Sequence, residues 1–201
     1  MRAMAVLTPA ARLRRRIAAA ALLVSAPVNA IGVTALVAMY VGFAIGERST
    51  AMALGRANDI LGLVGAALMA PAVIEIHALT GPDRRVVRIT LVVAGVGAIA
   101  AIVWLQYLLV TERLTFEEQI GPVMIAYAAI AAWFIGGGWL ASQAGIMPGG
   151  ARLGAMAALY VGQPWWAYRW GRRLLESSTG SPSSREADGP AASAGREAVA
   201  R

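Results

Sequence analysis

The stretch that decides the fold is IAAAALLVSAPVNAIGVTALVAMYVGFAIG, residues 17–46, which contains no charged side chain. Residues 89–111 and 119–151 are likewise free of charged side chains. About 20 apolar residues, rising about 1.5 Å each, cross the roughly 30 Å hydrocarbon core of a bilayer. These three runs therefore indicate transmembrane segments and not the core of a soluble domain.

The composition of the whole chain agrees with this interpretation. Of its 201 residues 58% are hydrophobic and 14% are charged, and the mean hydropathy is +0.62. Soluble domains carry about 25% charged residues. Because backbone polar groups inside lipid must pair within the protein, the spanning elements must be helices. We predict an all-α integral membrane helix bundle with about five transmembrane helices.

The charge pattern concerns topology more than it concerns binding partners. The formal charge is +7, every basic residue is an arginine, and the arginines cluster beside the apolar segments. This placement is typical of the positive-inside signal, so we expect lipid contact and no nucleic-acid partner. Cysteine is absent, which excludes a disulfide framework and a thiolate metal site.

The chain divides into three regions. Residues 1–16 form a basic N-terminal head, residues 17–175 a transmembrane helical domain, and residues 176–201 a polar, proline-bearing tail that we predict to be disordered. Within the domain we predict helices at 17–46, 58–79, 86–110, 120–141 and 152–170. Val28-Asn29-Ala30 is an acceptable signal-peptidase site, but the apolar run is about twice a usual signal length, which favours an uncleaved helix.

Arginine counts in the short loops predict a cytoplasmic N-terminus in a cell membrane. That orientation places the head and the loop at residues 82–88 inside. The C-terminal end disagrees, because five spans leave three arginines outside, namely Arg169, Arg172 and Arg173. Either residues 152–170 span the membrane, or they re-enter and leave the tail inside. The positions of the tyrosines and tryptophans favour five spans.

Three ionisable residues of the second predicted helix are candidate functional residues: Asp59, Glu75 and His77. At about 100° per residue, Glu75 and His77 face nearly opposite sides, and Asp59 lies about 24 Å from Glu75 along the helix. An intramembrane carboxylate suggests function. Glu75 lies near the cytoplasmic end, which favours ion pairing across the following turn, with Arg84, Arg85 or Arg88. A single histidine builds no two-histidine metal or haem site, so we expect no metal and no cofactor.

Small residues recur at four-residue spacing in the last apolar segment, at Gly150, Gly154, Ala158 and Gly162. Such a stripe lets membrane helices approach closely. It favours packing inside the bundle, and a homodimer contact is the alternative. Prolines at positions 27, 71 and 164 interrupt the predicted helices and are expected to kink them.

The segment from Trp139 to Leu175 resembles the end of a family of uncharacterised bacterial multi-pass membrane proteins, domains of unknown function. The matching elements are Gly145-Ile-Met147-Pro148, Leu153-Gly154 and Trp170-Gly171-Arg172-Arg173. Gly149 replaces the arginine that usually follows the turn proline. The resemblance implies a helical bundle and assigns no catalytic residue.

No nucleophile with a neighbouring base, and no metal-ligand cluster, is apparent in the helices. We therefore predict a protein that is not an enzyme and that acts through helix packing with itself or with a membrane partner. The competing hypothesis is a small transporter or permease-like protein that uses Asp59 and Glu75 inside the membrane.

Overall fold

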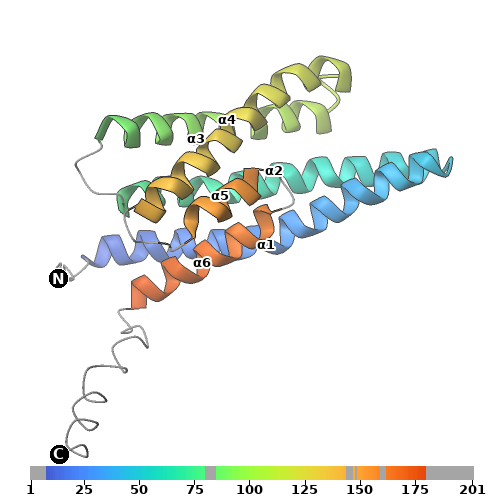
Figure 1. The fold of residues 1–201 in the computed structure, drawn as a ribbon. Helices are drawn as coiled ribbons and strands as arrows, with labels where there is room; N and C mark the ends of the chain where they lie inside the picture. Colours follow the sequence, from blue (N-terminus) through green and yellow to red (C-terminus); the bar gives the residue numbers. More distant parts are fainter. Residues whose placement is uncertain (1–7, 80–84, 144–146, 148, 159–161, 180–201) are drawn as a thin grey trace, which may run out of the picture.

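The computed structural model describes residues 8–79, 85–143, 147, 149–158 and 162–179. Its described part is all-α, as predicted. The six helices are α1 (Pro9–Ala44), α2 (Arg48–Leu79), α3 (Arg85–Val110), α4 (Phe116–Gln143), α5 (Gly150–Ala158) and α6 (Gln163–Thr179) (Figure 1). Four of these, α1 to α4, are long and apolar enough to cross a membrane, which indicates a multi-pass membrane protein.

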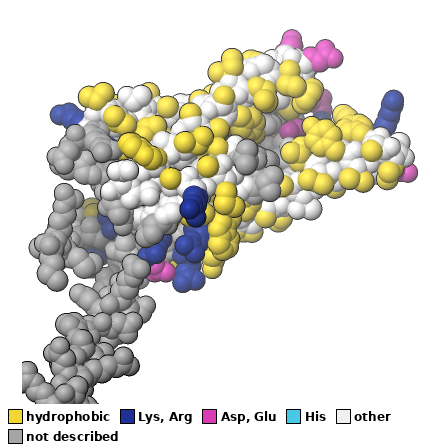
Figure 2. Space-filling view, viewed as in Figure 1, with side chains coloured by type: hydrophobic (Ala, Val, Ile, Leu, Met, Phe, Trp, Pro, Cys, Tyr) yellow, Lys and Arg dark blue, Asp and Glu magenta, His cyan; other side chains and the backbone are white. Residues whose placement is uncertain are grey.

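The helices pack in chain order around one core. Each helix contacts the next one along the chain, and α6 returns to pack on α1, so that the ring of contacts closes. We call the end of the bundle at which α1 begins the inner end, and the end with the α1–α2 turn the outer end (Figure 1). Apolar side chains also cover much of the outside of the helices, as a lipid-facing surface requires (Figure 2).

Aromatic side chains from α4 and α6 fill the centre of the bundle. Trp166 of α6 packs edge-on against Phe134, with ring centroids 4.7 Å apart, and against Trp133 at 5.5 Å. Trp170 lies one turn further along α6, and all four rings are at most 2% exposed. Since aromatic pairs add stabilisation to that of buried area, these contacts attach α6 firmly to the long helices.

The fifth predicted segment, 152–170, contains parts of two helices and is not one span. The break precedes Pro164, which is the second residue of α6 and has no N–H to continue a preceding helix. With nine residues, α5 rises only about 13 Å. Figure 1 shows α5 running from the inner end toward the middle of the bundle and α6 running back. Neither helix is among the four candidate spans of the described part.

Other helix bounds differ less from the prediction. α2 begins at Arg48 and not near residue 58, so the expected loop is reduced to a tight turn in which Gly46 has a φ of 83°. Close packing of Gly42 against Ala51 extends the hairpin up to that turn. α6 continues to Thr179, so the first residues of the predicted tail are helical, and residues 180–201 lie outside the described part.

The small-residue stripe packs inside the bundle. A Cβ added at Gly154 would collide with the carbonyl oxygen of Phe134, and Gly150 is pressed against the backbone of Gly138. Ala158 ends α5, and Gly162 lies beyond that helix. The face formed by Gly150 and Gly154 is therefore covered by α4 and is not open to a second copy.

This packing predicts opposite effects for two glycine substitutions. Gly154→Ala should lower the free energy of unfolding by about 1–3 kcal/mol, because the backbones of α4 and α5 must separate. Gly97→Ala is the matched control: no atom lies within 4 Å of its added Cβ. It should stabilise α3 by about 0.5–1 kcal/mol. Thermal unfolding in detergent measures both, and equal shifts would contradict the packing.

Candidate functional site

Glu75 is the centre of an ion-pair cluster that joins α2 to α1. Its carboxylate is fully buried and accepts hydrogen bonds from Arg14 Nε at 2.6 Å and from Arg15 Nε at 3.1 Å. Arg15 is itself 12% exposed, whereas Arg14 is 57% exposed. Both hydrogen bonds are charge-assisted, the stronger class of protein hydrogen bond. The cluster therefore stabilises a buried carboxylate that would be costly alone.

These partners differ from the predicted ones. The sequence predicts pairing with Arg84, Arg85 or Arg88, which follow Glu75 along the chain, and Arg84 lies outside the described residues. The antiparallel hairpin instead brings the basic start of α1 beside the end of α2, across 60 residues of sequence. Glu75 therefore pairs with arginines of another helix.

The other two candidates do not join this cluster. Asp59 belongs to the same helix, α2, sixteen residues before Glu75 and toward the outer end, with Pro71 between the two. His77 belongs to α2, but its side chain lies outside the described part. Among the described residues no group of three potential metal ligands occurs. Asp59 and Glu75 are thus not assembled into one site.

A second polar cluster surrounds a small cavity inside the bundle. The cavity has a volume of about 20 Å³ and is lined by the polar side chains of Asn29, Tyr127 and Gln163. Apolar residues of α2, α3 and α4 complete it: Gly62, Ala66, Met69, Ile99, Ile102 and Ile130. Such a volume admits one water molecule.

The polar groups at this cavity come from separate helices. Asn29 of α1 is 4% exposed, and its Nδ2 has no hydrogen-bond partner in the described part of the chain. Gln106 of α3 is 6% exposed, and its Oε1 likewise has no hydrogen-bond partner in the described part of the chain. Gln163 opens α6. A water molecule here would satisfy the Asn29 amide, but no nucleophile and base are paired for catalysis.

Sequence reasoning did not find this cluster. Asn29, Gln106 and Gln163 are single polar residues on three different apolar segments, separated by more than fifty residues from one another. Only the return of α6 into the bundle brings Gln163 to the cavity. A buried amide in each segment was the available signal, but nothing in the sequence connects them.

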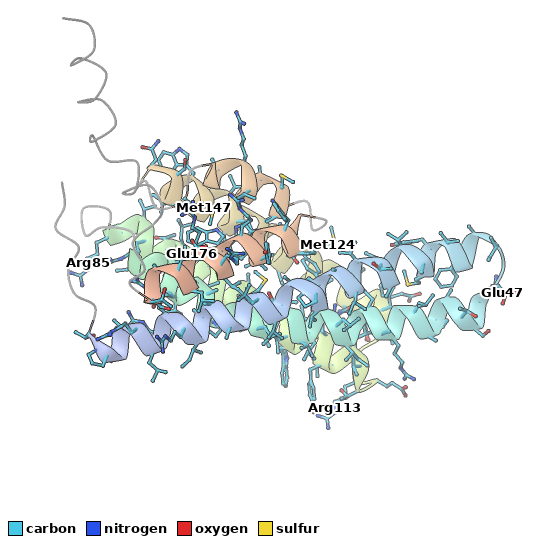
Figure 3. The ribbon with its side chains drawn as sticks, turned by 90° about the horizontal axis from the view of Figure 1, so that it is seen from below. Glu47, Arg85, Arg113, Met124, Met147 and Glu176 are labelled. Carbon is cyan, nitrogen blue, oxygen red and sulfur yellow. The ribbon has the colours of Figure 1, made fainter. Side chains whose placement is uncertain are left out.

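The outer end of the α1–α2 hairpin is a third notable feature. Arg56 of α2 forms an ion pair with Glu112 at the α3–α4 turn. The hairpin continues beyond that level, and Figure 3 shows Glu47 lying well past Arg113. Large apolar side chains are exposed there, including Tyr40 at 65%, Ile45 at 70% and Met52 at 66%.

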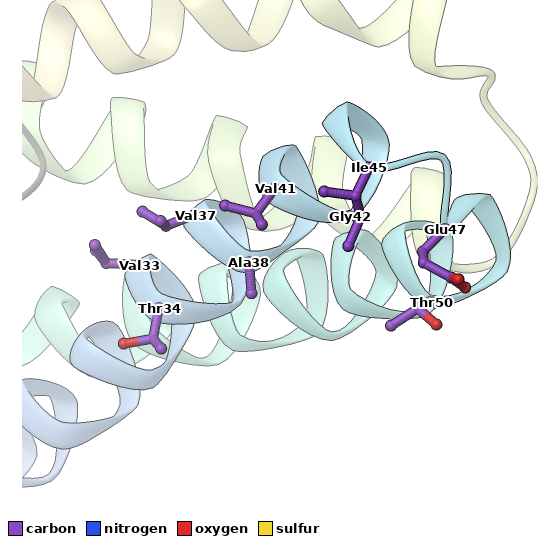
Figure 4. A pocket seen from close by; sticks show the side chains of 9 residues that line it. All are labelled: Val33, Thr34, Val37, Ala38, Val41, Gly42, Ile45, Glu47 and Thr50. Carbon is purple, nitrogen blue, oxygen red and sulfur yellow. The ribbon is translucent and has the colours of Figure 1, made fainter.

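An apolar groove runs along this part of α1. It is lined by Val33, Val37, Val41 and Ile45, with Glu47 and Thr50 of the turn and α2 at its outer rim (Figure 4). The groove is open along its length and its wall is almost wholly apolar. We use the name outer hairpin for residues 39–55, the part of α1 and α2 that lies beyond the Arg56–Glu112 pair.

Comparisons with known proteins add no assignment. The chain matches no family model, and no curated protein or solved structure matches it either. The resemblance of residues 139–175 to uncharacterised bacterial membrane proteins stays a prediction.

The Glu75 cluster predicts a stability defect that depends on burial. Glu75→Gln removes the charge that Arg15 faces, so the free energy of unfolding should fall by about 3 kcal/mol. Glu176→Gln is the matched control, since Glu176 pairs with Arg172 on the surface at 3.3 Å. Exposed pairs contribute under about 1 kcal/mol. Chemical denaturation in detergent compares the two variants. Similar small losses of unfolding free energy in both would show that the Glu75 cluster does not stabilise the fold.

Proposed function

We propose that this chain is a multi-pass membrane protein without enzymatic activity that self-associates through its outer hairpin. One observation carries the proposal: the outer hairpin projects past the α3–α4 turn while exposing large apolar side chains. Contiguous exposed apolar surface of this kind marks interaction sites.

The spacing of charged residues supports an extramembrane position for the outer hairpin. Along α2, Arg56 and Glu75 are nineteen residues apart, about 28 Å at 1.5 Å per residue. Along α3, Arg88 and Val110 are about 33 Å apart. Both distances suit a hydrocarbon core about 30 Å thick. The outer hairpin then extends about 12 Å further, from Arg56 to Arg48.

Apolar side chains at that height are not covered by lipid tails. Ile45 and Met52 would each expose most of their surface to water, which is unfavourable by about 25 cal/mol per Å². Contact with another protein removes this cost. A covering partner is therefore favoured.

A second copy of the chain suits this surface. The turn places Glu47 and Arg48 next to each other, so a two-fold axis at the tip pairs each acid with the arginine of the other copy. The exposed side chains of Tyr40 and Phe43 then face the apolar groove of the second copy. Self-complementary charge and shape favour a homodimer over an unrelated partner.

The same arrangement implies a topology of four spans and a re-entrant pair. The inner end collects the arginines of the head of α1 and those of α6, because α6 runs back to that end. An inner end in the cytoplasm then satisfies the positive-inside rule at both ends of the chain. This topology removes the conflict that five spans leave at Arg169, Arg172 and Arg173.

The transporter hypothesis has less support. It relies on Asp59 and Glu75, and Glu75 is already neutralised by two arginines. The polar cavity lined by Asn29, Tyr127 and Gln163 holds only about one water molecule. A solute path would need more space and more polar groups than this.

Cysteine labelling tests the topology, because the native chain has no cysteine. Glu47→Cys and Ser177→Cys should react from opposite sides of the membrane. In intact cells an impermeant maleimide should label the cysteine at position 47, and the cysteine at position 177 should react only after permeabilisation. Labelling of both from outside would support five spans.

Cross-linking tests self-association. Oxidation of the Glu47→Cys variant in membranes should still give a covalent dimer, because this substitution removes the ion pair at the tip and leaves the apolar contact of the outer hairpin. Adding Ile45→Ser should weaken association about tenfold, because about 1.5 kcal/mol of apolar burial is lost. Val86→Ser is the matched control, since Val86 is 78% exposed at the inner end.

Three outcomes would contradict this prediction. The cysteine at position 47 could stay monomeric under oxidation, Ile45→Ser could cross-link as well as its parent, or position 47 could cross-link to a different protein. The last outcome would keep the outer hairpin as a docking surface and exclude a second copy as its partner.

A further inference from the structure

The exposed side of α6 carries an ordered group of aromatic and basic side chains. We call Trp165, Tyr168, Arg169 and Arg172 the aromatic–arginine face. Their spacing of three, four and seven residues places them on one side of the helix. All four are exposed, while Trp166 and Trp170 on the opposite side are buried in the core.

The side chains of this face hold one another in place. Trp165 and Tyr168 are stacked with ring centroids 5.9 Å apart, and the guanidinium of Arg169 lies 5.8 Å from the Trp165 ring. Arg172 Nη1 lies 3.4 Å from the Tyr168 hydroxyl. Cation–π contact and stacking limit the rotamers of both arginines. Two guanidinium groups are thus presented together on an aromatic base.

Basic charge exceeds acidic charge around the face. Glu176 lies 3.3 Å from Arg172 and 3.9 Å from Arg173, and it is the acid of α6. Arg12 and Arg16 of α1 are also exposed at this end. Figure 2 shows basic side chains gathered over α6 beside an apolar strip. Within the described part of the chain, Glu176 is the one acid on α6, and it leaves most of this charge without compensation.

Depth in the membrane decides what binds there, and this step rests on the proposed topology. Gly171 of α6 packs against Ala19 and Leu23 of α1, three to seven residues further into the bundle than Arg16. At 1.5 Å per residue, this contact lies about 5–10 Å deeper in the bundle than Arg16. Arg169 precedes Gly171 by two residues and Arg172 follows it, and an extended arginine side chain at this depth reaches the headgroup phosphates.

We infer that the aromatic–arginine face binds the phosphate of an anionic phospholipid in the leaflet at the inner end. Arg169 binds the phosphate oxygens bidentately through its planar guanidinium, and Arg172, which also contacts Tyr168 and Glu176, adds a second positive charge beside it. Trp165 and Tyr168 lie deeper and pack along the glycerol and the first methylenes of the acyl chains. This apolar base is what distinguishes a lipid from free phosphate as the ligand.

Native mass spectrometry of the full chain tests the inference. The purified protein is titrated in detergent with phosphatidylglycerol or phosphatidylcholine. The parent should retain phosphatidylglycerol preferentially. Arg169→Gln with Arg172→Gln should weaken that binding roughly 25-fold, about fivefold for each arginine.

Matched variants separate this site from general charge. Arg48→Gln with Arg113→Gln removes two exposed arginines at the outer end and should leave lipid binding unchanged. Arg169→Lys with Arg172→Lys keeps the charge but should still lose most of the preference, because lysine cannot bind bidentately. Thermal unfolding should be unchanged in all three, since these side chains are exposed.

The following results would overturn the inference: equal retention of the two lipids by the parent, an equal loss in the outer-end variant, full retention by the lysine variant, or displacement of the lipid by excess inorganic phosphate. The last result would indicate a free-phosphate site. Self-association is measured separately by cross-linking at position 47, which the variants at positions 169 and 172 should not affect. Failure of the lipid site and failure of the proposed homodimer are therefore distinguishable.

Discussion

The burial of the Glu75 carboxylate is the constraint on which the arrangement of the helices depends. A carboxylate with no exposed surface must be neutralised by nearby cations, and the structure does this with Arg14 and Arg15. Because these arginines belong to the start of α1, pairing fixes the register of α1 against α2. A slip of one helical turn, about 5.4 Å, would separate the charges inside the bundle.

The same register accounts for features at both ends of the molecule. At the outer end, α1 and α2 stay paired up to Gly42 and Ala51, which produces a hairpin longer than a bilayer needs. At the inner end, the face of α1 with Ala19 and Leu23 remains available for α6. One register of α1 against α2 therefore produces the ion-pair cluster, the outer hairpin and the packing surface for α6.

The spans could be predicted from the sequence because lipid imposes a local requirement, a long uncharged helix. The partners of Glu75 could not be predicted, because they lie about sixty residues away and their position depends on helix register. The prediction of the fifth segment as one span was wrong for a related reason. Its hydropathy suits a span, whereas Pro164 divides it between two helices. The polar cavity could not be predicted either, because Gln163 reaches Asn29 only after α6 has folded back.

The amphipathic character of α6 explains why this helix returns and does not cross. Trp166, Trp170 and Leu174 are buried against the long helices, whereas the opposite side carries Arg169 and Arg172. A crossing helix would have to carry those arginines through the hydrocarbon core, at about 2.5–3.5 kcal/mol for each one near the centre. By starting in the middle of the bundle and running to the inner end, α6 buries its aromatic side and brings its arginines toward the phosphates.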